Sequence, residues 1–272
     1  WLRVASSADG SRLLACVDGG QLYTSTDSGV TWTPKDSNRS WYSVASSADG
    51  LHLVAVVYNG QIYTSADGGV TWIARDINRS WYSVASSSDG MRLVAANYNG
   101  QLHTSTDGGV TWSQHENNRS WTSVASSADG RRLVAGAYGG QLYTSSDAGL
   151  SWTARDSNRN WLSVASSSDG TRLIAAEDGG ALYSSNDSGL TWMIQASDAS
   201  RGWKGVAISA DGTKLVACPL GGQLYTYSTL LDQSTAGTTG GLSGGPGTAI
   251  ELQYIGNDTF QPLSYVGALN VF

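Results

Sequence analysis

The feature that most constrains this chain is a tryptophan that returns at a fixed distance. Trp1 is followed by Trp41, Trp81, Trp121 and Trp161 and, after two extra residues, by a sixth tryptophan at position 203. Most of the residues between these tryptophans recur with the same period. A period of this length is typical of a small unit that is copied along the chain and buries its apolar surface against its neighbours. The fold of the chain therefore follows from the fold of one unit.

The unit formed by residues 41–80 contains four short β-favouring runs separated by turns that contain glycine. None of the runs has the length or the periodicity of a helix. The dipeptide Asn59-Gly60 suits a type I′ hairpin turn, in which both central residues have positive φ. One four-stranded antiparallel sheet cannot bury both of its faces, whereas six sheets arranged radially cover one another. The pattern predicts an all-β, six-bladed β-propeller, with seven blades as the alternative.

The repeat also predicts how the chain is divided. We expect one propeller domain over residues 1–272, and its sixth repeat departs from the others. It keeps three strands and continues into a Ser/Thr/Gly-rich stretch, 228–248, which we expect to be a flexible loop. Residues 249–255 and 259–265 are expected to form a hairpin. One of its strands would complete blade six, and the other would cap the ring edge or pair with another chain, which makes an oligomer possible. The expected blades are 1–40, 41–80, 81–120, 121–160, 161–202 and 203–272.

Composition narrows the classes of partner and of compartment. Only 14% of the residues are charged and the net charge is −6, so nucleic acid and anionic membranes are disfavoured as partners. The apolar runs are too short for membrane insertion. Three lysines against thirteen arginines, with abundant Ser, Thr, Gly and Asn, favour a secreted, periplasmic or cell-surface protein. Cys16 and Cys218 occupy the same repeat position, where we expect small buried residues rather than a disulfide, because blades pack beyond disulfide reach.

The loop that follows the third run of each unit has a specific sequence. Residues 25–32 read Ser-Thr-Asp-Ser-Gly-Val-Thr-Trp, and the pattern Ser-x-Asp-x-Gly-x-(Thr/Ser)-Trp recurs at 65–72, 105–112, 145–152 and 185–192. It resembles the Asp-box, or BNR, repeat of sialidases and related six-bladed propellers. We expect its tryptophan to pack in the core and its aspartate to accept hydrogen bonds from its own turn. The aspartates expected to hold these loops are Asp27, Asp67, Asp107, Asp147 and Asp187.

The sialidase catalytic set that the resemblance would imply is missing. That chemistry uses three arginines, a Tyr nucleophile with a Glu partner, and an acid/base, but the only glutamates here are Glu116, Glu177 and Glu251. A glycosidase needs two carboxylates of unlike environment at one place, and Glu251 with Asp258 are the only candidates outside the repeat pattern. The three histidines form no spaced cluster, and we expect them on the surface. We therefore predict no catalytic residue, no metal and no cofactor.

The second tryptophan position, at the start of each blade, comes with other polar residues. An acid, an arginine three residues later and a tryptophan two residues after that occur at all five internal junctions. The tyrosines of the second turn, Tyr58, Tyr98 and Tyr138, are expected to line the same cleft between blades. An indole face beside a guanidinium and a carboxylate is suited to stacking on a sugar and binding its hydroxyls. The junction residues are Asp36, Arg39 and Trp41; Asp76, Arg79 and Trp81; Glu116, Arg119 and Trp121; Asp156, Arg159 and Trp161; and Asp198, Arg201 and Trp203.

Three functional hypotheses follow. The first is a non-catalytic, multivalent glycan-binding module, which resembles the six-bladed fucose-binding lectins in architecture and residue types, without a match of motifs. The second is a protein-assembly scaffold with a ring of arginines, as in the Asp-box propellers that assist photosystem II assembly. The third, weaker hypothesis is a glycoside hydrolase. A purely structural role of the junction residues is an alternative to all three. In that case the acid and the arginine form an ion pair across the blade junction, and the tryptophan packs over it. The separating observation is whether each arginine is paired with its acid or lies open beside an exposed tryptophan.

Overall fold

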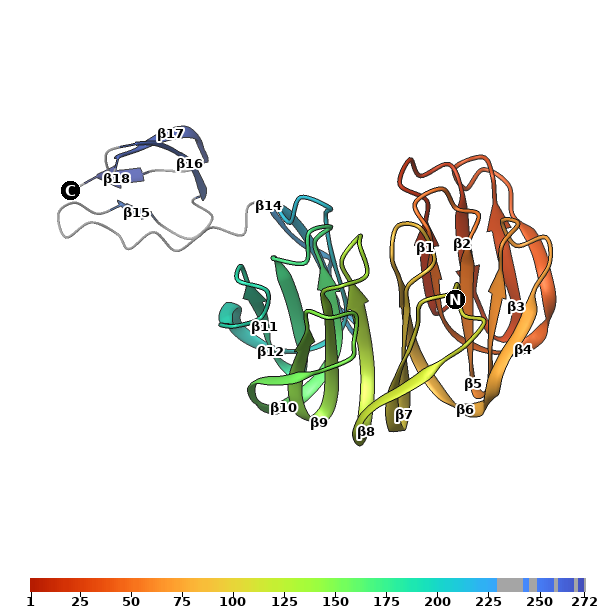
Figure 1. Cartoon of the computed structure of the whole chain (residues 1–272). Coiled ribbons are helices and arrows are strands. Elements are labelled where there is room, and N and C mark those ends of the chain that lie inside the picture. The colour runs from red at the N-terminus through yellow and green to blue at the C-terminus, as the bar shows by residue number, and fades with distance from the viewer. Residues whose placement is uncertain (229–241, 245–248, 257–258, 267–268, 272) are drawn as a thin grey trace. The chain divides into compact units, whose positions relative to one another are not determined.

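The computed structural model describes residues 1–228, 242–244, 249–256, 259–266 and 269–271, and all the regular elements among them are β-strands (Figure 1). The chain divides into two compact units, Trp1–Leu230 and Leu231–Phe272, which are described separately. In the first unit, fourteen antiparallel strands pair in sequence order. They are β1 (Arg3–Ser6), β2 (Leu13–Cys16), β3 (Asp18–Ser25), β4 (Thr33–Ser46), β5 (Leu53–Ser65), β6 (Ile73–Ser86), β7 (Leu93–Ser105), β8 (Ser113–Ser126), β9 (Leu133–Ser145), β10 (Thr153–Ser166), β11 (Leu173–Ser185), β12 (Met193–Ile208), β13 (Lys214–Pro219) and β14 (Tyr225–Ser228).

The long strands are shared between consecutive blades. Strand β6 pairs with β5 through Ile73–Ser80 and with β7 through Trp81–Ser86, so a blade boundary lies inside one continuous strand. The backbone bends at Asp76, where φ is 55° and the register shifts. This arrangement places the outer strand of one blade and the inner strand of the next on the same chain segment. It also places each junction acid at a bend rather than in a free loop.

The turn between the second and third strands of a blade is not the type I′ turn that Asn59-Gly60 predicted. In the first repeat the amide of Gly20 donates to the carbonyl of Val17 at 3.2 Å, so the turn begins at residue 17. Positive φ then falls only on its third residue, Gly19 at 70° or, in the second repeat, Asn59 at 56°. Positive φ at the third residue alone defines a type II turn. The type I′ prediction is wrong because the turn starts one residue earlier than assumed.

The core consists of five apolar clusters, one at each interface between consecutive blades. At the first interface Leu14, Cys16 and Leu22 of blade one contact Trp41 and Val44 of blade two. The equivalent residues form the other four clusters, and each cluster contains a blade-opening tryptophan. Cys16 and Cys218 are both free thiols, as expected for residues that act as small apolar side chains.

Backbone hydrogen bonds also join consecutive blades. The amide of Ala8 donates to the carbonyl of Ala48 at 2.8 Å, and the amide of Ala48 donates to that of Ser88 at 2.7 Å. Three equivalent bonds continue this backbone ladder through residues 128, 168 and 210. Next to it, the hydroxyl of Ser43 accepts a bond from the amide of Val84, again across a blade interface. Each blade is therefore fixed to the next by apolar packing and by backbone bonds.

The described residues of the second unit form four strands in two antiparallel pairs. The strands are β15 (Leu242–Gly244), β16 (Ala249–Gly256), β17 (Thr259–Val266) and β18 (Leu269–Val271), and β15 pairs with β18 while β16 pairs with β17. The hairpin expected from residues 249–265 is therefore present. Most of the expected loop 228–248 lies outside the described residues. Completion of blade six by the tail remains a prediction.

Candidate functional site

The junction arginines are paired with the acids that precede them. The shortest distances between guanidinium and carboxylate atoms are 3.7 Å for Arg39 with Asp36 and 3.6 Å for Arg79 with Asp76. They are 3.8 Å for Arg119 with Glu116 and 3.5 Å for Arg159 with Asp156, where Glu177 also lies within 3.8 Å of Arg159. The side chain of Asp198 lies outside the described part of the chain.

The same arginines lie over aromatic rings of the core. The guanidinium carbon of Arg39 is 4.6 Å from the ring centre of Tyr63 and 5.8 Å from that of Trp41. Arg201 lies 4.7 Å from the ring centre of Tyr225, and Arg119 and Arg159 repeat the arrangement with Tyr143 and Tyr183. Cation–π contact and ion pairing together hold Arg39, Arg79, Arg119 and Arg159 at their own junctions.

The two tryptophan populations are buried to different degrees. The junction tryptophans are at most 1% exposed; they are Trp41, Trp81, Trp121, Trp161 and Trp203. Each indole packs edge-on against a neighbouring aromatic side chain or lies inside an apolar cluster. The tryptophans of the Ser-x-Asp-x-Gly-x-(Thr/Ser)-Trp loops, hereafter the Asp loops, are partly exposed instead. The expected open indole face at each junction is wrong, because the next strand and its tyrosine cover the ring. The Asp-loop tryptophans lie at the edge of the core, where Trp72, Trp112, Trp152 and Trp192 pack against the apolar clusters.

The acids at the junctions have a backbone role that the sequence did not reveal. Asp36, Asp76, Glu116 and Asp156 all have φ between 51° and 65°. This left-handed conformation is unfavourable for residues with a side chain, although aspartate tolerates it better than most. The side-chain amide of Gln61 donates to the carbonyl of Asp76 at 2.8 Å, and three other repeats contain the same bond. The acid therefore shapes the bend, and its carboxylate neutralises the arginine.

The Asp loops are held by their own aspartates, as predicted. The carboxylate of Asp27 accepts hydrogen bonds from the Thr31 hydroxyl at 2.5 Å, the Ser25 hydroxyl at 2.7 Å and the Thr31 amide at 2.9 Å. The hydroxyl of Thr31, then its amide and the Ser25 hydroxyl, lower the pKa of Asp27 to about 2. A carboxylate that accepts three hydrogen bonds inside its own turn, with its pKa lowered by them, is suited to hold the turn rather than to act as an acid/base catalyst.

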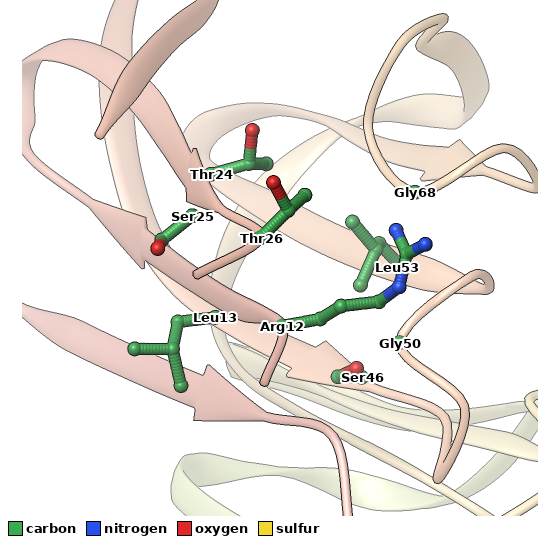
Figure 2. Close-up of a pocket in the computed structure, with 9 residues that line it drawn as sticks. All are labelled: Arg12, Leu13, Thr24, Ser25, Thr26, Ser46, Gly50, Leu53 and Gly68. Atoms are coloured by element: carbon green, nitrogen blue, oxygen red, sulfur yellow. The ribbon is translucent and has the colours of Figure 1, made fainter. Parts of the chain in front are cut away.

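A small cavity lies beside the Asp loops where blades one and two meet (Figure 2). Arg12 extends from blade one across Gly50 of blade two, and a Cβ atom at Gly50 would come within 2.7 Å of the arginine side chain. The cavity has a volume of about 10 Å³, which is room for one water molecule at most. It marks the contact between two blades and is too small for a ligand.

A larger cavity of about 400 Å³ lies where the inner strands begin. Its volume falls in the range of small-molecule sites. Three of the predicted residues, Tyr58, Tyr98 and Tyr138, line it, while the predicted arginines, acids and tryptophans do not. We call it the tyrosine cavity, and its lining is Tyr42, Tyr58, Tyr82, Tyr98, Thr122, Tyr138 and Leu162.

The tyrosines of this cavity contact one another across blades. The ring centres of Tyr42 and Tyr82 are 4.5 Å apart, and each ring also contacts the turn tyrosine of its own blade, Tyr58 at 5.4 Å and Tyr98 at 5.3 Å. Burial, followed by a hydrogen bond with Tyr82, raises the pKa of Tyr42 well above its ordinary value. The phenol of Tyr42 is therefore a neutral hydrogen-bonding group at physiological pH.

The sequence analysis did not nominate Tyr42, Tyr82, Thr122 and Leu162. A signal for them was present, because the residue after each blade-opening tryptophan differs between repeats. It reads Leu2, Tyr42, Tyr82, Thr122, Leu162 and Lys204 along the chain. The turn position varies in the same way, as Asp18, Tyr58, Tyr98, Tyr138, Asp178 and Leu220. The tyrosines come from blades two to four, so the repeat symmetry is broken along this cavity.

One of the three histidines, His103, is buried instead of lying on the surface as expected. His103 replaces the tyrosine of the third strand and is buried, with its ring centre 4.7 Å from that of Trp81 in an edge-on arrangement. Burial, then the charge of Arg79, lowers the pKa of His103 to about 4 although Asp76 lies 3.8 Å away. Among the described residues no three His, Cys, Asp or Glu side chains are placed to hold a metal, and no helix is long and apolar enough to cross a membrane.

Comparison with known proteins identifies the fold. No protein-family model matches the sequence, and no curated protein does. A GH74 enzyme from Niastella koreensis superimposes with a TM-score of 0.66 at 21% identity, over 84% of this chain and 37% of that chain. YCF48 bound to a D1 peptide gives a TM-score of 0.63 at 18% identity, over 84% and 77%. The Cps50 (Swd1) β-propeller domain of Myceliophteria thermophila gives 0.65 at 14% identity, over 83% and 81%.

At these identities the likeness concerns the fold alone. The predicted all-β propeller of four-stranded antiparallel blades is confirmed, and the number of blades is consistent with six. This chain spans about 37% of the length of the GH74 enzyme, and the three neighbours differ in function. What this propeller binds must therefore be argued from its own residues.

Proposed function

We propose that this protein is a non-catalytic binding module that holds a neutral glycan in the tyrosine cavity. Five of the seven lining residues are tyrosines, and none carries a charge. Tyrosine rings pack against the C–H faces of sugars, and phenol groups donate to and accept from sugar hydroxyls. The size of the cavity and its asymmetric aromatic lining are the observations that support this proposal.

The same geometry weakens the junction hypotheses. An inter-blade glycan site needs an open indole, and the junction indoles are covered. A ring of arginines for an acidic partner needs free guanidinium groups, and four of the five have a carboxylate within 4 Å. A glycosidase needs a pair of carboxylates at the bound sugar, and no carboxylate lines the cavity.

We also propose that the chain is a member of the Asp-box propellers. The five Asp loops share one hydrogen-bond pattern, with the aspartate bound to the Ser two residues before it and the Thr or Ser four residues after it. Support comes from this repeated geometry and from the sequence resemblance described above.

A glycan array followed by calorimetric titration tests the binding proposal. The informative variant is Tyr42→Thr with Tyr82→Leu, because blades four and five have these residues at the same position and the fold accommodates both. Loss of two stacking surfaces is expected to weaken binding at least about tenfold. Tyr143→Phe, which removes a phenol outside the cavity, is the matched control.

Three outcomes are informative. Glycan affinity that is unchanged in the double variant would exclude the tyrosine cavity as the site. No binding of any glycan at millimolar concentration would exclude the ligand class. A peptide that binds the wild type and is lost with the double variant would keep the cavity and replace the glycan by a protein partner.

A further inference from the structure

Two charged residues of blades five and six stand at positions that line the tyrosine cavity in other blades. Asp178 occupies the second-turn position that tyrosines fill in blades two to four. Lys204 follows its blade-opening tryptophan, as Tyr42 and Tyr82 do. The ammonium group of Lys204 donates to Oδ1 of Asp178 at 3.1 Å, across the interface between the two blades. An ion pair thus stands where other blades have aromatic rings.

The register of the strands places this pair beside the lining of the cavity. Strands β10 and β11 of blade five pair in the same register as β4 and β5 of blade two. Leu162, which lines the cavity, and Asp178 therefore correspond to the two tyrosines of blade two whose ring centres are 5.4 Å apart. Lys204 stands one blade after Leu162, and the tyrosines of blades two and three at this position have ring centres 4.5 Å apart. The ion pair therefore borders the cavity at Leu162.

Both charged side chains are accessible. The side chain of Lys204 is 40% exposed and that of Asp178 is 27% exposed. An ion pair as exposed as this one contributes little to stability, so holding the blades together does not account for it. An ammonium group carries only hydrogen-bond donors and a carboxylate only acceptors, and one bond between them leaves capacity on both groups. The pair can therefore bind polar groups of a ligand in the cavity.

We propose that Asp178 and Lys204 bind two adjacent hydroxyl groups of the glycan in the tyrosine cavity, an inference that rests on the function proposed above. One hydroxyl donates to the carboxylate, and its neighbour accepts from the ammonium group. Tyrosine rings pack against the C–H face of many sugars, whereas the ion pair requires hydroxyls at fixed places. The pair has no net charge, which suits a neutral sugar better than an acidic or an amino sugar. The ligand class is therefore narrowed to neutral sugars with a free vicinal diol.

Calorimetric titration of the full chain with the methyl glycosides of glucose, galactose and mannose, each compared with its monodeoxy analogues, tests the proposal. The wild type is expected to bind at least one glycoside about tenfold more tightly than the analogue that lacks one of the two hydroxyls. The informative variants are Asp178→Leu and Lys204→Leu, because blades six and five have leucine at these positions. Each should weaken binding of the glycoside to the level of its deoxy analogue.

Two further variants separate the ion pair from the rest of the site. Tyr42→Thr with Tyr82→Leu should weaken binding of the glycoside and of its deoxy analogue alike, and keep the preference between them. Lys214→Leu removes an exposed charge of blade six at the other end of strand β13 from the second turn, and it should bind both sugars like the wild type.

Three results would overturn the proposal. If both leucine variants kept the wild-type preference while the tyrosine double variant lost affinity, the glycan would bind in the cavity without the ion pair. If the leucine variants weakened binding of the glycoside and of its deoxy analogue equally, the pair would support the shape of the site and recognise no hydroxyl. If neither the glycosides nor any glycan of an array bound at millimolar concentration, the function proposed above would fail together with this inference.

Discussion

The junctions between blades and the tyrosine cavity are built from adjacent residues of the same repeat, yet they differ in how faithfully they are copied. The acid, arginine and tryptophan recur at all five junctions, and the residue directly after the tryptophan changes from blade to blade. The recurring residues are buried or paired, while the changing residues line a cavity. Within one chain, repetition therefore marks the residues that hold blades together, and departure from repetition marks the residues free to take on recognition.

The largest expected effect separates the two tryptophan populations. Trp121→Ala removes a fully buried indole from an interface and is expected to lower the free energy of unfolding by about 3–5 kcal/mol. Trp32→Ala removes a partly exposed indole and should cost less than half as much. Chemical denaturation followed by circular dichroism measures both, and equal losses would contradict the difference in burial between the two indoles.

The second largest effect on stability is expected at His103, which stands where the other repeats have a tyrosine. Because the pKa of His103 is about 4 when folded and about 6.5 when unfolded, the unfolded chain binds the extra proton. The stability contribution is complete above pH 6.5 and is lost as the pH falls from 6.5 towards 4, by up to about 3 kcal/mol. His103→Tyr restores the repeat residue and should flatten the pH dependence of the melting temperature in this window. His52→Arg, which also restores the repeat residue, is the control. It should leave the pH dependence of the melting temperature that His103 causes unchanged.

A smaller effect tests the backbone role of the junction acids. Glu116 has φ 65°, a conformation that costs a residue with a side chain about 1–2 kcal/mol. Glu116→Gly removes this strain along with a solvent-screened ion pair, so its melting temperature should match or exceed that of the wild type. Glu116→Val keeps the side-chain strain and should lower the free energy of unfolding by about 1–2 kcal/mol. If both variants lost the same stability relative to the wild type, the ion pair and not the bend would be the reason for the acid.

The smallest effect on stability is expected at the cavity. Leu162→Tyr gives blade five the residue of blades two and three, and its free energy of unfolding should stay within about 1 kcal/mol of the wild type. If the cavity binds glycans, the added ring should tighten binding. A large loss of stability would show that the variable positions are as constrained as the junctions.

Much of the fold was predictable because one unit contains all of its own turn signals. The glycine-containing turns and the β-favouring runs predicted the four strands, and the Asp loops form as the position of Ser25, Asp27 and Thr31 indicated. The type II turn was missed because Gly60 after Asn59 suggested a turn centred one residue later. This error left the strand order unchanged.

The site was less predictable for a physical reason. Whether Trp41 or Trp72 is buried depends on which side of the strand the next blade covers, and a strand pattern alone does not fix that side. The three turn tyrosines were found because they lie at the end of a hairpin that faces the cavity. Tyr42 and Tyr82 were missed because recurring residues, rather than changing ones, were taken as the mark of function.

The backbone ladder between blades has a consequence for how the protein is made. Each of its bonds joins residues about one repeat apart, so no blade needs a distant part of the sequence to find its partner. Such short separations favour rapid folding from neighbouring segments. A chain emerging from the ribosome can dock each new blade on the one before it, and the first complete pair provides the template for all that follow.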